Sequence, residues 1–289
     1  MNRYESNRNW TISEIIHWGT SYLNKKGCES PRLSIELLLC SVLNTTRLDL
    51  YLNFDKPLKK KELDELKSKI NLLLRNEPIQ YILGWTQFLE FKLSLSRKVF
   101  IPRPETEQLV KFIIKKNESK QERKMSILDI GCGSGAISIA LASFFRNSQV
   151  LAIDIDTNAI EQTKENALLN NVSNIETMEL DIFKCVPEGS FDIIVSNPPY
   201  IPISEYSELP PQLQNEPKIA LTDEKDGLSF YKRFAKIFPR MLKEDGSFYL
   251  EVGWNQANLV SEIFAKEGFS VQIEKDFQGI KRIVYSIRF

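Results

Sequence analysis

The four residues with the most specific chemistry are Asn197, Pro198, Pro199 and Tyr200, which directly follow the apolar run Phe191–Ser196. A buried strand that stops at two prolines leaves carbonyl oxygens unpaired, because proline has no N–H and its φ is fixed. The Asn197 side-chain oxygen and the Pro198 carbonyl could accept both hydrogens of a planar –NH2 group, while the Tyr200 ring covers its face. These residues predict an amide or an exocyclic amine as substrate. The alternative is a rigid proline corner with Tyr200 packed in the core.

A glycine-rich loop at residues 131–135, Gly-Cys-Gly-Ser-Gly, is a second candidate site. Alternating glycines allow the backbone to turn tightly and to approach a ligand closely. Dinucleotide folds prefer Gly-x-Gly-x-x-Gly and hold pyrophosphate at the helix N-terminus. Here an acid, Asp129, precedes the glycines and would repel a phosphate. The loop therefore favours a cationic ligand.

Two further aspartates stand at the ends of predicted strands. Asp154 closes the second strand, where a carboxylate can accept hydrogen bonds from both hydroxyls of a ribose. Asp181 closes the third and precedes Ile182 and Phe183, so an acceptor beside apolar residues could hold an adenine. Each aspartate alone could simply be a helix cap. Three acids at successive strand ends, counting Asp129, favour a ligand site.

Alternating strands and helices must position these residues. Strands are predicted at 126–130, 149–153, 175–180, 192–196, 247–252, 270–275 and 280–287, and helices at 136–145, 157–170, 228–238 and 256–267. This pattern predicts an α/β fold with a doubly wound, mostly parallel sheet. The last two strands, separated by little more than a Gly279 turn, should pair as neighbours or form an antiparallel edge. In such sheets, ligands bind at the carboxyl ends of the strands.

The part before this sheet has a different pattern. Apolar residues recur every three or four positions from Thr11 to about Asn76, which predicts a small helical bundle. An alternating apolar stretch, Trp85–Phe100, predicts a β-hairpin within a linker, and Glu105 opens a helix. We therefore expect a helical domain at 1–76, a linker with a β-hairpin at 77–104, and a catalytic domain at 105–289.

These residues together resemble the class I S-adenosylmethionine-dependent methyltransferases. More narrowly, the chain is similar to the bacterial peptide chain release factor glutamine methyltransferases of the PrmC/HemK type. The resemblance covers nearly the whole chain and rests on the glycine loop and on the segments Glu77-Pro-Ile-Gln-Tyr-Ile-Leu-Gly84, Ile101-Pro-Arg-Pro-Glu-Thr-Glu107, Ser196-Asn-Pro-Pro-Tyr-Ile201, Asp226-Gly-Leu228 and Asp276-x-x-Gly279. The Asn-Pro-Pro-Tyr box also occurs in enzymes that methylate amino groups of DNA and RNA. The segment 101–107 and the helical domain favour the release-factor branch.

The resemblance implies roles for individual residues. The fold would be a seven-stranded methyltransferase sheet with an antiparallel edge strand. Cofactor-binding residues would be Asp129, Gly131, Cys132, Gly133, Ser134, Gly135, Asp154, Asp181, Ile182 and Asn197. The substrate glutamine would contact Phe100, Asn197, Pro198, Pro199 and Tyr200, of which Asn197, Pro198 and Tyr200 would be catalytic. Relatives usually carry glycines where this chain has residues 222–225, which leaves the shape of that loop open.

Composition limits the remaining possibilities. The chain has 38 basic and 38 acidic side chains, but 16 basic against 11 acidic residues in positions 1–100 leave that part at +5 and the rest at −5. No apolar stretch is long enough for a membrane span, and the N-terminus lacks the apolar run of a signal peptide, so we expect a cytoplasmic protein. The four cysteines and one histidine show no metal-ligand spacing, so no metal is predicted. We also expect a monomer.

Three other functions remain open. An amino-methyltransferase acting on adenine or cytosine of DNA or RNA would need the same acceptors after base flipping. The acidic charge of the site-bearing part disfavours duplex binding, and no dedicated nucleic-acid reader is evident. A dinucleotide oxidoreductase would place pyrophosphate against Asp129. A silent module would bind release factors or ribosomes without transferring a methyl group.

Overall fold

The computed structural model describes residues 9–287. The chain forms two compact units, Met1–Leu83 and Gly84–Phe289. The first unit extends beyond residue 76, because the short helix α5 (Ile79–Leu83) packs against α2 and α4. The hairpin that the sequence placed in a linker belongs to the second unit.

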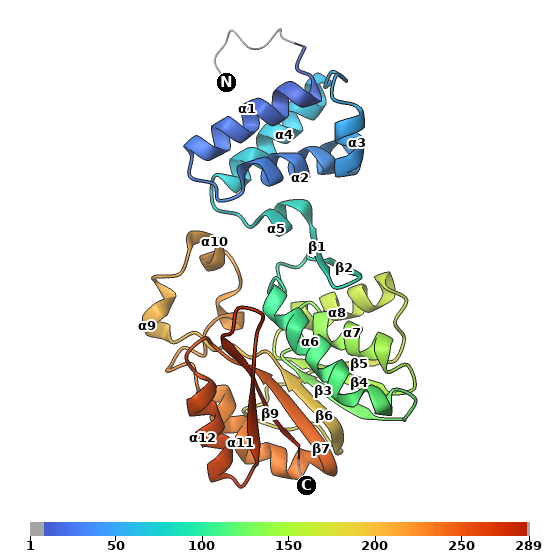
Figure 1. The fold of residues 1–289 in the computed structure, drawn as a ribbon, viewed down its shortest axis with the longest axis vertical. Coiled ribbons are helices and arrows are strands. Elements are labelled where there is room, and N and C mark those ends of the chain that lie inside the picture. Colours follow the sequence, from blue (N-terminus) through green and yellow to red (C-terminus); the bar gives the residue numbers. More distant parts are fainter. Residues whose placement is uncertain (1–8, 288–289) are drawn as a thin grey trace. The chain divides into compact units, whose positions relative to one another are not determined.

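The first unit is helical (Figure 1). Its other helices are α1 (Ile12–Lys25), α2 (Pro31–Leu43), α3 (Arg47–Leu52) and α4 (Lys60–Leu73). Thr11 begins α1 through a capping box: its hydroxyl accepts from the Glu14 N–H at 3.3 Å, and the Glu14 carboxylate accepts from the Thr11 N–H at 3.0 Å. Leu23, Ile35 and Leu38 are fully buried in a single apolar core. The predicted helical bundle is confirmed.

The hairpin consists of β1 (Trp85–Phe88) and β2 (Phe91–Ser94), and a buried amide side chain connects it to the rest of the second unit. Asn166, in α8 (Thr157–Leu169), accepts from the Ser94 N–H at 2.7 Å and donates to the Ser94 and Ser134 carbonyls at 3.0 and 2.8 Å. Asn166 is fully buried, so these bonds are shielded from water. The same side chain therefore ties the hairpin to the glycine loop.

A seven-stranded sheet organises the second unit. Its strands are β3 (Ser126–Ile130), β4 (Gln149–Asp154), β5 (Ile175–Glu179), β6 (Phe191–Ser196), β7 (Leu242–Glu251), β8 (Val271–Lys275) and β9 (Lys281–Ile287). The spatial order is β5-β4-β3-β6-β7-β9-β8. Neighbours from β5 to β7 pair in parallel, whereas β9 pairs antiparallel with both β7 and the edge strand β8. The predicted fold class, with its antiparallel edge, is confirmed.

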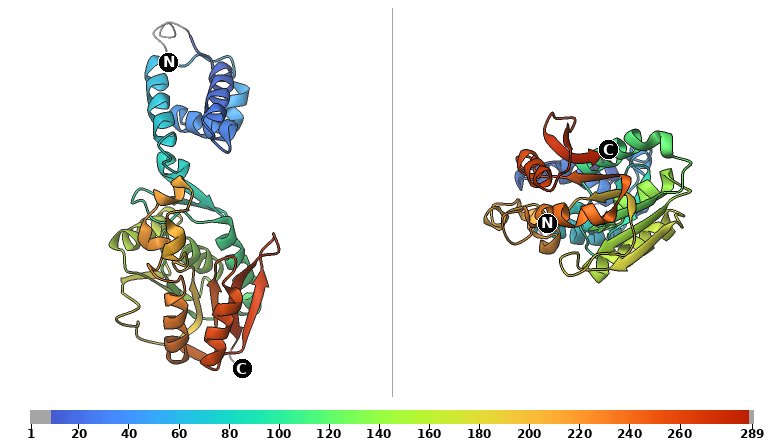
Figure 2. Two further views of the ribbon diagram at one scale, coloured as in Figure 1. Left: turned by 90° about the vertical axis from the view of Figure 1, so that its left-hand side faces the viewer. Right: turned by 90° about the horizontal axis from the view of Figure 1, so that it is seen from below.

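Helices cover both faces of this sheet, as Figures 1 and 2 show. One face carries α6 (Pro104–Asn117), α7 (Ala136–Phe144) and α8, and the other carries α11 (Ser229–Met241) and α12 (Ala257–Lys266). Each face has its own apolar core: Leu109 and Ile139 lie in the first, and Phe234 and Phe264 in the second. A mostly parallel sheet that helices cover on both faces needs strands with nearly continuous runs of apolar residues.

Several element boundaries differ from the predictions. Strand β7 begins at Leu242 and not at Ser247, because the polar residues 243–246 conceal its first half. Helix α11 continues through Pro239 to Met241, since a proline near a helix end removes only one hydrogen bond. No helix was predicted between β6 and α11, yet α9 (Ile203–Tyr206), α10 (Pro211–Gln214) and the 3-10 turn η3 (Lys218–Ala220) lie there. No described helix is both long and apolar enough to cross a membrane.

Candidate active site

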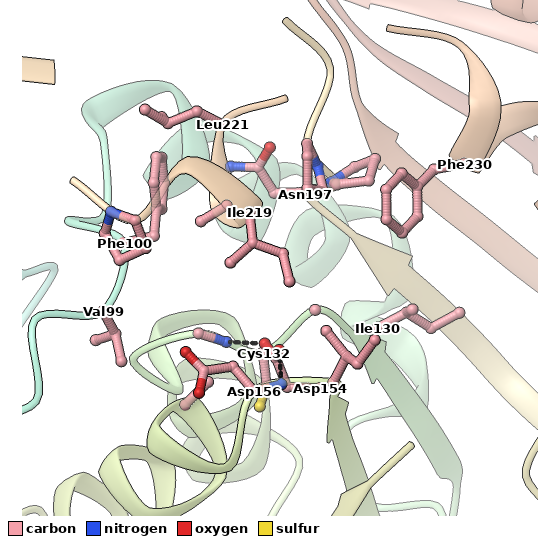
Figure 3. Close-up of a pocket in the computed structure, with 18 of the residues that line it drawn as sticks. Val99, Phe100, Ile130, Cys132, Asp154, Asp156, Asn197, Ile219, Leu221 and Phe230 are labelled. Atoms are coloured by element: carbon pink, nitrogen blue, oxygen red, sulfur yellow. Dashed lines mark hydrogen bonds between the residues drawn. The ribbon is translucent and has the colours of Figure 1, made fainter. Parts of the chain in front are cut away.

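A cavity of about 560 Å³ opens at the carboxyl ends of β3, β4 and β6. Figure 3 shows it, with Asn197 on one side and Asp154 on the other. Of the residues predicted from sequence, it is lined by Phe100, Gly131, Cys132, Gly133, Ser134, Asp154, Asp181, Ile182, Asn197, Pro198, Pro199 and Tyr200. Asp129 and Gly135 are absent from this lining. The fold therefore brings together most of the predicted cofactor and substrate residues.

The glycine loop has the backbone conformation that its residue types predict. Gly131, Gly133 and Gly135 have φ values of 78°, 55° and 81°, in the left-handed region that glycine adopts without penalty. A Cβ atom on Gly135 would lie 3.0 Å from the Thr163 side chain, so this glycine also permits close packing of the loop on α8. A Cβ atom on Gly131 would meet no protein atom within 4 Å. Since Gly131 lines the cavity, its backbone is exposed for contact with a ligand.

Asp154 is held by backbone donors (dashed lines in Figure 3). One carboxylate oxygen accepts from the Gly133 N–H at 3.0 Å and the other from the Asp156 N–H at 3.0 Å. Burial raises the pKa of Asp154, and these two hydrogen bonds oppose the rise. Each oxygen keeps a lone pair, so the carboxylate can still accept bonds from ligand hydroxyls.

Asp129 lies behind the loop and is completely buried. Its Oδ2 accepts from the Ser138 hydroxyl at 2.5 Å, whereas Oδ1 is buried without a hydrogen-bond partner among the described residues. Burial raises the pKa of Asp129 to about 7, and the nearby Asp154 charge adds to the rise. In this structure, Asp129 can act on a ligand only through the charge that it places behind the cavity wall.

The third predicted acid, Asp181, lies at a more open end of the cavity. Its carboxylate accepts from the Phe183 N–H at 3.0 Å and pairs with Lys184 at 3.2 Å. Burial alone would raise the pKa of Asp181, but these partners lower it. Ile182 is buried beside it, and the Phe183 ring packs edge-on against Phe230 at 4.9 Å. An apolar wall next to a carboxylate suits a heteroaromatic ring that carries an amine.

The Asn197 corner presents two acceptor oxygens. Asn197 Nδ2 donates to the Thr106 hydroxyl at 3.1 Å, which directs the amide nitrogen away from the substrate side. No group in residues 9–287 is found donating to Asn197 Oδ1 or to the Pro198 carbonyl. Tyr200 lines the cavity, and its own carbonyl accepts from Gln256 Nε2 at 2.8 Å. The corner is therefore a rigid pair of acceptors beside an aromatic ring.

A buried carboxylate fastens the segment that follows α10 to residues 101–103, which precede α6. Glu216 is 5% exposed; it accepts from the Ile101 N–H at 3.1 Å and forms an ion pair with Arg103. The Arg103 guanidinium in turn lies 4.9 Å from the Phe100 ring centroid. Residues 217–224, which follow Glu216, line the cavity. This clamp therefore positions both the predicted substrate residue Phe100 and the wall opposite the glycine loop.

The loop whose shape the sequence left open is ordered by an aspartate. Asp223 accepts from the N–H groups of Lys225, Gly227 and Ser229, all at 2.9 Å, and so connects the loop to the start of α11. Glu224 adopts φ 58°, the left-handed conformation in which glycine is preferred. The position thus keeps a glycine-like backbone although the residue is a glutamate.

Sequence reasoning missed several cavity residues. They include Val99, Thr106, Ile219 and Phe230. Thr106 lies inside the segment 101–107, which carries the family resemblance but does not by itself indicate a role for the threonine. The others have no local signal, because their roles depend on contacts across the fold. No cluster of three or more metal-ligating side chains occurs among residues 9–287.

Comparisons with known proteins identify the family. The description "PrmC N-terminal domain" matches residues 14–84, and "Methyltransferase small domain" matches residues 106–208. A release factor glutamine methyltransferase of Fusobacterium nucleatum is 38% identical over 275 residues, which are 94% of this chain and 77% of the relative. One of Geobacter sulfurreducens is 35% identical over 277 residues, 95% of this chain and 96% of the relative. The chain belongs to the release factor glutamine methyltransferase family.

Membership of this family makes the chain an S-adenosylmethionine-dependent methyltransferase and confirms the predicted enzyme class and cofactor. A solved methyltransferase from Pyrococcus furiosus shares the fold, with a TM-score of 0.52 and 20% identity, over 77% of this chain and 98% of that one. The cavity fits the cofactor chemically. Its glycine loop leaves space at Gly131, and the acids Asp129, Asp154 and Asp181 favour a cation with ribose hydroxyls over a phosphate.

Proposed function

We propose that this enzyme methylates the side-chain amide nitrogen of the glutamine in the Gly-Gly-Gln motif of peptide chain release factors. The names of its relatives support this substrate, and one observation in the structure carries the site assignment. The Asn197 side-chain oxygen and the Pro198 carbonyl lie at the cavity wall and accept from no described residue, and a primary amide offers two hydrogens to match them. Phe100, Pro199 and Tyr200 would enclose the glutamine side chain.

The acceptors address the main obstacle of the reaction. An amide nitrogen is a weak nucleophile because its lone pair is delocalised, and this resonance appears as a barrier of roughly 18–20 kcal/mol to rotation about a peptide bond. Hydrogen bonds from the –NH2 group to Asn197 and Pro198 would raise electron density on nitrogen. They would also stabilise the positive charge that develops as the nitrogen gains a methyl group. After the methyl group arrives, the nitrogen would release one of its two hydrogens as a proton to water, and no side chain is assigned as a general base.

The remaining predicted residues would hold the cofactor. Asp154 would accept the ribose hydroxyls, Asp181 and Ile182 would contact the adenine, and Gly131, Cys132, Gly133, Ser134 and Gly135 would form the backbone cradle, with Asp129 behind it. When bound, S-adenosylmethionine supplies an electrophilic methyl group. Fixing the nitrogen in line with that group removes translational freedom, which can contribute roughly 7–11 kcal/mol in well-oriented systems.

The direct test locates the transferred methyl group. The purified chain is incubated with methyl-labelled S-adenosylmethionine and either a bacterial release factor or unmethylated DNA, and mass spectrometry identifies the labelled atom. We expect label on the glutamine amide of the Gly-Gly-Gln motif. Label on DNA alone would establish the amino-methyltransferase alternative, and binding of release factor without label would indicate a silent module.

For the helical unit, we propose that it contacts the body of the release factor and that the enzyme acts as a monomer. Positions 1–83 carry 13 basic against 10 acidic side chains, a net charge of +3, and the description that matches residues 14–84 belongs to the same family. Deleting residues 1–83 should raise the KM for release factor far more than the Kd for S-adenosylmethionine. Equal losses in both would contradict this division of roles. The molar mass of the intact chain in solution, measured by light scattering, tests whether it is a monomer.

A further inference from the structure

Outside the residues already assigned, the second unit contains a buried carboxyl group that the proposed chemistry does not use. Glu251 ends β7 and is 1% exposed, so its burial needs an explanation. Its Oε2 accepts a hydrogen bond of 2.7 Å from the hydroxyl of Thr106, which lies in the first turn of α6 and is itself 3% exposed. Thr106 in turn accepts from Asn197 Nδ2 at 3.1 Å. Three elements that are distant in sequence therefore form a chain of hydrogen bonds that ends at the proposed catalytic amide.

We infer that Thr106 and Glu251 are positioning residues, which hold the Asn197 side chain so that its oxygen, and not its nitrogen, faces the substrate amide. This inference rests on the proposed function. It extends that function to two residues that do not themselves need to touch the substrate glutamine.

The donors and acceptors on each side chain fix the direction of this chain of hydrogen bonds. An ionised carboxylate can only accept, so the single hydroxyl hydrogen of Thr106 must point to Glu251. The Thr106 oxygen is then left with lone pairs alone and can only accept from Asn197. Because an amide has its oxygen and nitrogen on opposite sides, holding the nitrogen at Thr106 directs the oxygen away from it. A flipped Asn197 would offer a donor where the –NH2 group of the substrate needs an acceptor.

A carboxylate suits this role better than a neutral amide would. A glutamine at position 251 could accept from Thr106 through its oxygen or donate to it through its nitrogen, so both directions of the chain would be possible. The surroundings also keep Glu251 in place: its backbone carbonyl accepts from the Tyr231 hydroxyl at 2.9 Å, and it pairs with Ile283 in the sheet. The acceptor therefore stands on rigid elements.

The first test compares two substitutions of Thr106. Thr106→Ser keeps the hydroxyl, and its kcat for methylation of a release factor should stay within about twofold of that of the unmodified enzyme. Thr106→Val keeps the shape but removes both hydrogen bonds, and its kcat should fall by about tenfold or more while the Kd for S-adenosylmethionine is unchanged. Ser247→Ala is the matched control, since it removes a buried β7 hydroxyl that has no partner among the described residues. Thr106→Ala replaces the valine variant if the latter does not fold.

The second test is the pH profile. Burial raises the pKa of Glu251 to about 7; Glu105 adds to the rise, and Thr106, Arg282 and Arg103 oppose it. A protonated Glu251 can donate to Thr106 and reverse the chain, so kcat should increase as this group ionises. In Glu251→Gln that inflection should be lost.

A third measurement separates this inference from the substrate assignment. Nuclear magnetic resonance of the 15N-labelled side-chain amide of Asn197, assigned through its loss in Asn197→Asp, should show one hydrogen-bonded proton in the unmodified enzyme and in Thr106→Ser but not in Thr106→Val. If the enzyme does not methylate a release factor, the proposed function is wrong. The amide signal still tests whether Thr106 holds the Asn197 side chain. Unchanged kcat, pH profile and amide signal in Thr106→Val would overturn the inference.

Discussion

The carbonyl oxygen of Tyr200 lies so close to Gly227 that a Cβ atom on Gly227 would overlap it. Two segments that are separate in sequence, the proline corner at 197–200 and the turn at 226–228, are thus in backbone contact. Gln256 reinforces the contact, since its Nε2 donates to the Tyr200 carbonyl at 2.8 Å and to the Gly227 carbonyl at 3.4 Å. The glycine at 227 is therefore a requirement of the active-site corner.

Gly227→Ala should accordingly be severely destabilising. The added Cβ would collide with a backbone atom that cannot move freely, at a φ of 76° that disfavours any side chain. We expect a loss of about 3 kcal/mol or more in the free energy of unfolding, measured with denaturant. Gly268→Ala is the matched control: its φ is 86°, but a Cβ there meets nothing within 4 Å, so its cost should be about 1 kcal/mol. Equal costs would show that the contact with Tyr200 is unimportant.

Removing the Asn197 side chain should abolish most of the activity. Asn197→Ala deletes one of the two acceptors that would activate the substrate nitrogen, and we expect kcat to fall by roughly 10²–10³, as for loss of a preorganised polar group in other active sites. Steady-state rates with saturating release factor and cofactor measure this. Asn258→Ala, which removes only an exposed hydrogen bond to Lys281, is the control. Turnover in Asn197→Ala close to that of the control would refute the acceptor mechanism.

The contribution of Tyr200 should depend on its ring. Burial raises the pKa of its hydroxyl, which therefore stays protonated and neutral at physiological pH. Tyr200→Phe preserves stacking and should change kcat/KM for release factor by less than about threefold, whereas Tyr200→Ala opens the cavity wall and should lower it by roughly tenfold or more. A larger effect from phenylalanine than from alanine would assign the essential role to the hydroxyl.

The parts of the site that could be predicted from sequence are short segments that directly follow a single strand. Strand β6 was recognisable from its apolar run, and the prolines after it marked where it stops. The contacts of Thr106 with Asn197 and with Glu251 could not be predicted. The hydrogen-bonded residues are 91 positions apart in the first pair and 145 in the second. Local periodicity contains no information about such pairs. Glu251 in particular resembles an ordinary charged residue at a strand end.

The position of Asp129 shows a different limit. The sequence correctly placed it at the end of β3, but a strand end does not reveal which way a side chain turns. Its neighbour Ser138, on α7, supplies the hydrogen bond that holds the carboxyl group behind the loop. The short helices between β6 and α11 were missed because Pro202, Pro210 and Pro211 suggest loops, whereas here prolines begin the helices.

Buried Asp129 should make the folded protein less stable as the pH rises. Its pKa is about 7 in the folded state against 3.8 as the ordinary value, so the folded state binds one more proton than the unfolded state between these limits. The contribution of this group to the free energy of unfolding is therefore greatest below about pH 4. It decreases as the pH rises from about 4 to about 7. Asp129→Asn should reduce this dependence, and the part that remains would come from Glu251, whose buried carboxyl also has its pKa raised to about 7. Denaturant unfolding at pH 5 and pH 8 measures it, and a pH difference that is identical in both proteins would contradict the assignment.

The loop at 222–225 allows a clean comparison of two variants of one residue. Glu224 has a left-handed backbone and forms an exposed ion pair with Lys218 at 2.8 Å, so either substitution loses the same weak interaction. Glu224→Gly should be more stable than Glu224→Ala by about 1 kcal/mol, because only glycine adopts this conformation without steric cost. Thermal unfolding of the two variants side by side measures the difference. If alanine were the more stable, the loop would have to adopt another backbone conformation in solution, and the cavity wall that it forms would differ with it.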